Sequence, residues 1–391
     1  MITDELRIIG STQTNVVMAA EVTRIAHRAL GLRPPVPRKE GLGQLIYPFD
    51  RGLAWAAVTY LRTPTRVLWD VYRSRATRLE PLYDELVADI LADRRTLVRD
   101  GEGISVEVRR VDAVEAGERQ VVGTVKNALI DAAKRRGVRL HVDPAGPATR
   151  WVARGGGDPD GLVVSIDLGG GSLSQRGWRR EAGEAPLREH LAAVLLMLCR
   201  FDARNDVLVD PMCGSGTIPI EAIHAARATP RPTPAVTALR ALGFDRPASP
   251  LFPDAAPLVI GCDLDLGALA AARDNGRAAG VDDQVIWQRA DVTRLAPALI
   301  ADIARERGRP TPTTGLLLTN PPYGERLDDP DLAELYVAIA ETCRRFAGWR
   351  AGFLVGSPEL ERAFLRVIGR PRIKKPLANG NLRAYFYLYD L

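Results

Sequence analysis

The sequence predicts an α/β protein whose second half is a mostly parallel sheet covered by helices, preceded by a smaller α+β module. Strand and helix patterns alternate after residue 200, and such alternation builds a parallel sheet with helices on both faces. The first strand of this half leads into a glycine-containing loop, 210–221. Residues 1–180 mix strands and helices in no simple repeat, which favours an α+β arrangement.

Elements of the first half are predicted from apolar spacing. Helical spacing occurs at 18–30, 79–91 and 123–136. Alternation or apolar runs predict strands at 104–111, 138–142 and 161–168. The runs 55–61 and 65–72 fit either a helix or a strand, because a short apolar run shows no period. Three glycines at 169–171, followed by a basic stretch, are predicted to form a hinge.

Elements of the second half follow one another more regularly. A long apolar helix is predicted over 186–199, ahead of the first strand. The strands are predicted at 207–209, 258–262, 285–288, 315–319, 352–355 and 384–389. The helices are predicted at 218–227, 266–279, 331–346 and 359–367. Residues 228–257, rich in Pro, Ala and Thr, are predicted to be an irregular insertion.

Length and composition indicate a globular protein. The chain has 391 residues, enough for two or three domains, and is 46% hydrophobic and 26% charged. No apolar run reaches the ~18 residues that span a bilayer. Acidic Asp4 and Glu5 stand where a signal peptide needs basic and then apolar residues, so we expect a cytoplasmic protein without a membrane partner. The four cysteines form no CxxC pair and the histidines do not cluster with them, so we expect no metal.

Positive charge is concentrated in the first half. Residues 1–180 carry 28 Lys and Arg against 22 Asp and Glu, whereas residues 181–391 carry 25 against 26. This asymmetry predicts an N-terminal half that holds a polyanion and a C-terminal half that does chemistry. The candidates for phosphate contacts are Arg135, Arg136, Arg176, Arg179 and Arg180. Solvated surface charge is the alternative interpretation.

The loop after the first strand is the first candidate ligand site, because ligands of open α/β sheets bind beyond the carboxyl ends of the strands. Glycines let a chain turn tightly and let a ligand approach closely. Pro219 stands where a dinucleotide fingerprint has its third glycine and no P-loop Lys follows, which disfavours a dehydrogenase or a phosphate cradle. Asp210 would repel pyrophosphate but suits an ammonium group such as that of S-adenosylmethionine. The predicted cofactor-binding residues of the loop are Asp210, Cys213, Gly214, Gly216 and Thr217.

Acidic residues follow the next two strands. Asp263 is predicted to accept hydrogen bonds from ribose hydroxyls, and Asp291 from an adenine amine. Asp265 is expected to cap the helix that begins near Leu266. Cys213 is interpreted as a small packing residue rather than a nucleophile, because an amine attacks a methyl sulfonium without a covalent enzyme intermediate.

The segment after the fourth strand, 319–326, reads Thr-Asn-Pro-Pro-Tyr-Gly-Glu-Arg. Its prolines fix the backbone and remove two N–H donors, leaving the Asn320 amide oxygen and the Pro321 carbonyl as acceptors. An exocyclic –NH2 can donate to both, and Tyr323 can stack on a planar base. We predict that Asn320, Pro321, Pro322 and Tyr323 form the catalytic cleft, which acts by positioning rather than by a strong base. A proline turn without function is the alternative.

Segments 210–222 and 319–326 resemble motifs of the bacterial THUMP-domain RNA methyltransferases that make N2-methylguanosine. Segments 172–179 and 377–383 are similar to the connector and the C-terminus of that family. The resemblance covers about residues 45–391. It implies a Rossmann-like class I methyltransferase domain using S-adenosylmethionine, with Asp210, Gly214 and Gly216 at the methionine end of the donor, Asp263 at its ribose and Asp291 at its adenine. The cleft residues would hold the target guanine.

The same resemblance implies a domain order. It places a ferredoxin-like domain at 1–75, a THUMP RNA-binding domain at 76–170, a linker and lead-in helix at 171–200 and the methyltransferase domain at 201–391. The first 15 residues and the Pro-rich insertion depart from the family pattern.

Several functions remain open at this point. The resemblance favours a guanine in 23S ribosomal RNA, with transfer RNA as the second substrate. An Asn-Pro-Pro-Tyr cleft recognises any –NH2 on a planar group, so adenine or cytosine in DNA, or a protein glutamine, would fit as well. A non-catalytic RNA-binding assembly factor is disfavoured, because all four cleft residues are present. The oligomeric state is not encoded in any of these patterns.

Overall fold

The computed structural model of the chain describes residues 1–144, 146, 148–155, 161–180, 187–231, 242–243, 247–322, 330–379 and 382–391. The chain forms two compact units. The N-terminal unit comprises Met1–Gly10, Met18–Leu173 and Pro230–Ala248, and the C-terminal unit comprises Ser11–Val17, Ser174–Thr229 and Ser249–Leu391. In the residues described, no helix has the length and apolar character needed to cross a membrane.

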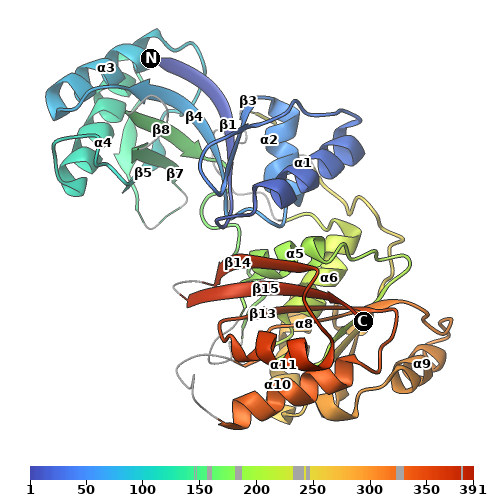
Figure 1. Ribbon diagram of the computed structural model, residues 1–391. Helices are drawn as coiled ribbons and strands as arrows, with labels where there is room; N and C mark the ends of the chain where they lie inside the picture. Colours follow the sequence, from blue (N-terminus) through green and yellow to red (C-terminus); the bar gives the residue numbers. More distant parts are fainter. Residues whose placement is uncertain are drawn as a thin grey trace. The chain divides into compact units, whose positions relative to one another are not determined.

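The N-terminal unit is built on one eight-stranded sheet (Figure 1) of order β2-β3-β1-β4-β8-β7-β5-β6. Its pairs are antiparallel except that β5 runs parallel to β6 and β7. The strands are Ile2–Ile9 (β1), Arg38–Lys39 (β2), Gln44–Pro48 (β3), Arg66–Ser74 (β4), Glu102–Arg109 (β5), Leu140–Val142 (β6), Thr149–Gly155 (β7) and Leu162–Asp167 (β8). The helices in this part of the chain are Asn15–Leu30 (α1), Arg51–Tyr60 (α2), Leu79–Ala92 (α3) and Glu118–Arg135 (α4).

The predicted boundary at residue 75 does not separate compact units. β4 is hydrogen-bonded to β1 on one side and to β8 on the other. Residues 1–75 and 76–170 therefore contribute to one sheet and one unit. The periodicity of a strand shows which face is buried but not which strand lies beside it, so the sequence pattern did not reveal this pairing.

The helices predicted in the first half are confirmed, although α4 begins earlier than expected, and the two ambiguous runs fall in α2 and β4. Asp50 caps α2, because its side chain accepts a hydrogen bond from the Leu53 N–H at 2.7 Å. Strands β1, β2, β3 and β7 were not predicted. In two of them, charged residues stand where apolar ones are expected: Arg7 in β1 is fully buried against Asp70 at 2.8 Å, and Arg154 in β7 is also buried.

The C-terminal unit is built on a seven-stranded sheet of order β11-β10-β9-β12-β13-β15-β14. Pairs from β11 to β13 are parallel, and β15 runs antiparallel to both β13 and β14. The strands are Val207–Asp210 (β9), Leu258–Asp263 (β10), Val285–Arg289 (β11), Gly315–Thr319 (β12), Arg350–Val355 (β13), Ile373–Asn379 (β14) and Leu382–Asp390 (β15). The chain order reverses at β9, so a crevice is expected beyond the carboxyl ends of β9 and β12.

Helices cover both faces of this sheet. One buried cluster joins the sheet to Glu189–Leu198 (α5), Thr217–Arg227 (α6) and Leu266–Ala279 (α8). A second joins the other face to Pro297–Glu306 (α9), Pro330–Cys343 (α10) and Glu359–Val367 (α11). Short 3₁₀ turns at Asp282–Gln284 and Val292–Arg294 flank β11. The predicted layer arrangement is therefore confirmed.

The strands and helices predicted in the second half are confirmed, with ends that shift by a few residues. The helix predicted over 186–199 corresponds to the shorter α5. Two further elements were not predicted, α9 and β14. Pro376 and the lysines beside it obscure β14, which is an edge strand, where proline is tolerated. The predicted insertion divides between the units, because Pro230–Ala248 clusters with the N-terminal one.

Substituting Gly352 by Ala is expected to destabilise the C-terminal unit. A Cβ at this position in β13 would lie 2.7 Å from the Cys199 sulfur and 2.9 Å from Leu318 Cδ1. Overpacking of a well-packed core costs about 1–3 kcal/mol, so the free energy of unfolding measured in urea should fall by that amount. As the matched control, Gly123→Ala in α4 meets nothing within 4 Å and should raise stability by up to about 1 kcal/mol. Equal stability of Gly352→Ala and the wild type would contradict the packing described.

Candidate active site

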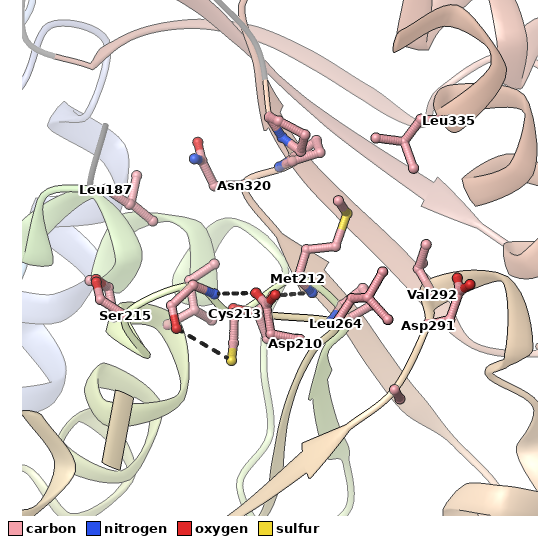
Figure 2. A pocket seen from close by; sticks show the side chains of 18 residues that line it. Leu187, Asp210, Met212, Cys213, Ser215, Leu264, Asp291, Val292, Asn320 and Leu335 are labelled. Atoms are coloured by element: carbon pink, nitrogen blue, oxygen red, sulfur yellow. Dashed lines mark hydrogen bonds between the residues drawn. The ribbon is translucent and has the colours of Figure 1, made fainter. Parts of the chain in front are cut away.

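A cavity of about 580 Å³ lies at the carboxyl edge of the sheet in the C-terminal unit (Figure 2). It is lined by residues that follow β9, β10, β11 and β12, together with Leu187 and Leu335. The predicted site residues in its wall are Asp210, Cys213, Gly214, Thr217, Asp263, Asp291, Asn320, Pro321 and Pro322. Its volume falls within the range of small-molecule sites, about 300–1,000 Å³.

The loop after β9 turns through two glycines with left-handed backbone, Gly214 at φ +50° and Gly216 at φ +83°. Gly214 lines the cavity, as predicted. Gly216 does not: a Cβ there would lie 2.8 Å from the ring of Trp287 on β11. Gly216 therefore permits close packing behind the loop, and its contact with a cofactor stays a prediction.

Asp210 ends β9, with its side chain buried in the floor of the site. Burial, reinforced by the neighbouring negative charge of Asp263, raises the pKa of Asp210 to about 7, although hydrogen bonds from Thr319 and the Met212 N–H oppose the shift. A buried carboxyl without a positive neighbour is stabilised in its charged form when a cation binds beside it. The floor of the cavity therefore favours a positively charged ligand group.

Two further carboxylates are held in place by the backbone. Asp263 Oδ2 accepts from the Gly214 N–H at 2.9 Å and Oδ1 accepts from the Asp265 N–H at 3.0 Å. Each carboxylate oxygen can accept a second bond, so both remain available to hydroxyl donors. Asp291 Oδ1 accepts from the N–H and the hydroxyl of Thr293, and these bonds hold the pKa of Asp291 below its usual value. Asp265 caps α8 at 2.7 Å, as predicted.

Asn320 follows β12 and presents its side-chain amide to the cavity (Figure 2). Its Oδ1 atom is buried and has no hydrogen-bond partner among the residues that the structure describes. An unpaired buried acceptor costs about 1–3 kcal/mol, so a donor group of a ligand would relieve that cost. The carbonyl of Pro322 accepts from the Tyr336 hydroxyl at 2.7 Å, which anchors the segment. Tyr323 lies outside the described residues.

Cys213 and Thr217 adjoin the cavity from inside the protein. Burial raises the pKa of the Cys213 thiol well above its usual range, so the thiol stays protonated at neutral pH and is a poor nucleophile. Its predicted packing role agrees with this environment. The Thr217 hydroxyl accepts from Arg179 at 3.0 Å. No group of three or more His, Cys, Asp or Glu side chains within the described ranges is arranged to hold a metal ion.

Arg176 does not lie on a free surface, contrary to its predicted role in RNA contact. Its side chain is 2% exposed and its Nε lies 3.3 Å from the fully buried Glu221 of α6. Arg179 is also engaged inside the protein, with Glu189 at 3.0 Å, the Leu187 carbonyl at 2.8 Å and Thr217. These bonds connect the lead-in segment to the starts of α5 and α6.

The other predicted RNA contacts are exposed. Arg135 and Arg136 lie at the end of α4 and Arg180 follows Arg179. Arg136 also donates to the Ile90 carbonyl at 3.1 Å. The sequence of a basic segment does not show which of its side chains face water and which pair with a buried acid. Only the structure shows that these three arginines are exposed, whereas Arg176 and Arg179 are paired inside the protein.

The cavity also has walls that sequence analysis did not identify. They are Leu187, Pro211, Met212, Ser215, Ile218, Leu264, Ala290, Val292 and Leu335. Leu264, Ala290 and Val292 adjoin the predicted acids in sequence, and the 60% exposure of Leu264 marks an apolar surface left open to a ligand. Leu187 and Leu335 come from distant segments, and no local pattern identifies them.

The strand order and the polar groups after four successive strands define a Rossmann-like methyltransferase domain. The chain belongs to the RMKL-like methyltransferase domain family (UPF0020), whose model matches residues 176–383.

Named relatives and a solved structure agree with this assignment. The chain is 37% identical over 264 residues to the ribosomal RNA large subunit methyltransferase K/L of Aeromonas salmonicida (strain A449), covering 60% of this chain and 35% of that protein. The corresponding protein of Chromohalobacter salexigens is 33% identical over 334 residues, 80% of this chain and 43% of that one. The chain thus spans less than half the length of these relatives. The crystal structure of SMU.472 complexed with SAH superposes with a TM-score of 0.77 and 25% identity, covering 100% of this chain and 98% of that one.

The raised pKa of Asp210 predicts a pH-dependent stability of the ligand-free protein. The unfolded chain loses this proton near pH 3.8, whereas the folded protein keeps it to about pH 7. Between these values the unfolded state binds fewer protons, so the free energy of unfolding falls as pH rises. Asp210→Asn removes this loss, so urea unfolding should show the stability of the variant rising relative to the wild type between about pH 4 and about pH 7. A constant difference across that range would contradict the assigned pKa.

Arg176→Ala tests the corrected role of this residue. Removing one partner of a buried ion pair costs about 3–5 kcal/mol, because the other charge stays buried. Urea unfolding should therefore show a loss of that size. The exposed Arg180, whose contact to Asn275 uses only its backbone N–H, supplies the matched control: Arg180→Ala should change stability by less than about 0.5 kcal/mol. Equal losses in the two variants would mean that Arg176 is not paired as described.

Proposed function

We propose that this protein transfers a methyl group from S-adenosylmethionine to the exocyclic N2 amine of a guanine in structured RNA, with large-subunit ribosomal RNA as the substrate. The observation that carries the proposal is the buried Asn320 Oδ1, which has no hydrogen-bond partner among the described residues and lies in the same cavity as Asp210, Asp263 and Asp291. An amine acceptor thus shares one cavity with carboxylates suited to a nucleoside that bears a positive charge.

The residues of the cavity fit S-adenosylmethionine. When bound, this donor supplies a methyl group on a positively charged sulfur. Asp210 would face the cationic methionine end, Asp263 would accept from the ribose hydroxyls, and Asp291 would accept from the adenine amine. The apolar side chains of Leu264 and Val292 would lie against the adenine ring. The relative SMU.472 was solved with SAH, which supports the same ligand class here.

The cleft after β12 would orient the substrate amine. Asn320 Oδ1 and the Pro321 carbonyl would each accept one N–H, so that the nitrogen lone pair points toward the methyl carbon. The amine nitrogen would then bond to the methyl carbon as that carbon leaves the donor sulfur, and the methylated amine would release a proton to water. Orientation by fixed acceptors supplies the catalysis, because no described group near the cleft is a strong base.

RNA as the substrate is supported by the names of the relatives and by charge. Both named relatives are ribosomal RNA methyltransferases. Residues 1–75 would form a ferredoxin-like part and residues 76–170 a THUMP part of the single eight-stranded sheet, with the exposed Arg135 and Arg136 available to phosphates. A guanine must leave its stack to enter the cleft, at a cost of a few kcal/mol, and backbone contacts elsewhere would offset that cost.

Labelled methyl incorporation tests the proposal. Ribosomal and transfer RNA from cells lacking the gene are incubated separately with the protein and labelled S-adenosylmethionine, and the nucleosides are then analysed. We expect N2-methylguanosine in ribosomal RNA. Asn320→Ala should lower the rate at least about 100-fold, the typical size of losing one oriented acceptor or donor, while binding of S-adenosylmethionine and RNA remains unchanged.

The other outcomes are distinct. N2-methylguanosine found only in transfer RNA would show that transfer RNA, and not ribosomal RNA, is the substrate, while the proposed reaction would stand. Label in duplex DNA, with none in either RNA, would overturn the proposed substrate. Full activity of Asn320→Ala would overturn the mechanism.

A further inference from the structure

The β14–β15 hairpin and the segment leading into it carry a local excess of positive charge. Residues 366–383 contain no acidic residue. Acidic residues elsewhere in 181–391 bring the net charge of that half close to zero and so hide the local excess. Six basic residues lie in 366–383: Arg366, Arg370, Arg372, Lys374, Lys375 and Arg383. A cluster of one sign on a domain that is otherwise near neutral marks a surface for an anionic partner.

The hairpin extends beyond the end of β13 (Figure 1), on the side of the sheet where β12 leads into the cavity residue Asn320. Pairing of β13 with β15 ends at Val355 opposite Tyr385, whereas β14 and β15 stay paired as far as Asn379 opposite Leu382. Three residue pairs therefore extend beyond β13, about 10 Å at 3.4 Å per residue. β13 runs parallel to β12, so the overhang points in the direction in which β12 leads into Asn320.

One face of the β14–β15 hairpin is largely exposed from Lys374 to its overhanging end, and we call the exposed residues of this face the hairpin platform. Register places Lys374, Pro376 and Ala378 of β14 on this face with Arg383, Tyr385 and Tyr387 of β15, and all of them are exposed except Tyr387, which is buried opposite Lys374. Tyr385 is 42% exposed and lies opposite the small Pro376. Lys374 Nζ lies 5.3 Å from the centroid of that ring. The platform thus combines a partly exposed aromatic residue with two cations, Lys374 beside the ring and Arg383.

The acidic groups near the platform are already paired. Glu361 on α11 contacts Lys374 at 2.7 Å and accepts from the Tyr387 hydroxyl at 3.2 Å. Asp390 pairs with Arg372 at the other end of the hairpin. Arg383 has no ion-pair partner among the residues that the structure describes. The charge of Arg383 is therefore available to a phosphate, and no acidic side chain in the described part of the chain is paired with it.

We propose that the hairpin platform binds an unpaired nucleotide next to the methylated guanine: its base stacks on Tyr385 and its phosphate pairs with Arg383. This inference rests on the proposed RNA methyltransferase function. Two strand spacings separate β12 from β15, which puts Tyr385 on the order of 10 Å from the end of β12. That span suits a nucleotide flanking the one held at Asn320. Stacking on an exposed aromatic ring beside a cation is how single-stranded nucleic acid is held without a base-specific code.

The test compares variants of the full chain on the RNA pool that the wild type methylates. Tyr385→Ala should raise the KM for RNA about tenfold, because one stacked base is lost. Tyr385→Phe keeps the ring and should recover most of that loss. Arg383→Gln should weaken RNA binding and reduce the slope of log affinity against log salt by about 1. The affinity for S-adenosylmethionine should be unchanged in all three.

A matched control separates the platform from general charge. Arg277→Gln on α8 removes a cation whose side chain is 61% exposed and which lies away from the hairpin, beside β11 at the other end of the sheet. It should leave the KM for RNA and the salt slope at the wild-type values. If the wild type methylates RNA and both Tyr385→Ala and Arg383→Gln leave the KM for RNA and the salt slope unchanged, the proposed role of the hairpin platform is wrong and the proposed function stands. A wild type that binds S-adenosylmethionine but methylates no RNA would overturn the proposed function first.

Discussion

The parallel pairing of β9 with β10 on one side and β12 on the other is the constraint on which the site depends. Because β9 lies where the chain order reverses, its carboxyl end and that of β12 are left uncrossed by a connection, and a cavity opens between them. Asp210 and Asn320, more than 100 residues apart in sequence, meet there for this reason alone. Gly216 makes the arrangement possible, since any larger residue would push the loop away from Trp287.

The same site holds polar groups at the expense of stability. Asp210 is a buried carboxyl with a raised pKa, and Asn320 Oδ1 is a buried acceptor without a described partner. Elsewhere in the unit, buried charges are satisfied within the protein: Arg176 pairs with Glu221, and Arg179 joins two helix starts to the lead-in segment. In the cavity, both an acceptor without a described partner and a carboxyl with a raised pKa lie where a ligand can reach them.

The net charge of a long segment does not show which of its charged side chains lie on the surface. The balance between the two halves drew attention to the first half and to the basic stretch ending at Arg180, of which two members proved to be internal. That count did not reveal the hairpin platform, because acidic residues elsewhere in the C-terminal half cancel its positive charge. Register and burial, which decide whether a charge reaches water, distinguish Arg383 from Arg176 although both are arginines in basic runs.

By itself the sequence determined the class of fold, nearly every strand and helix of the second half, and the groups that follow each parallel strand. These follow from local periodicity and from residues such as Pro321 and Gly214, whose backbone preferences act within a few positions. Only the tertiary structure decided that residues 1–170 share one sheet, that Gly216 packs behind its loop, that Arg176 is buried, and that Leu187 and Leu335 complete the cavity. Strand partners, burial and ion pairing depend on contacts between distant segments, and the periodicity of one segment carries no information about its neighbours in space.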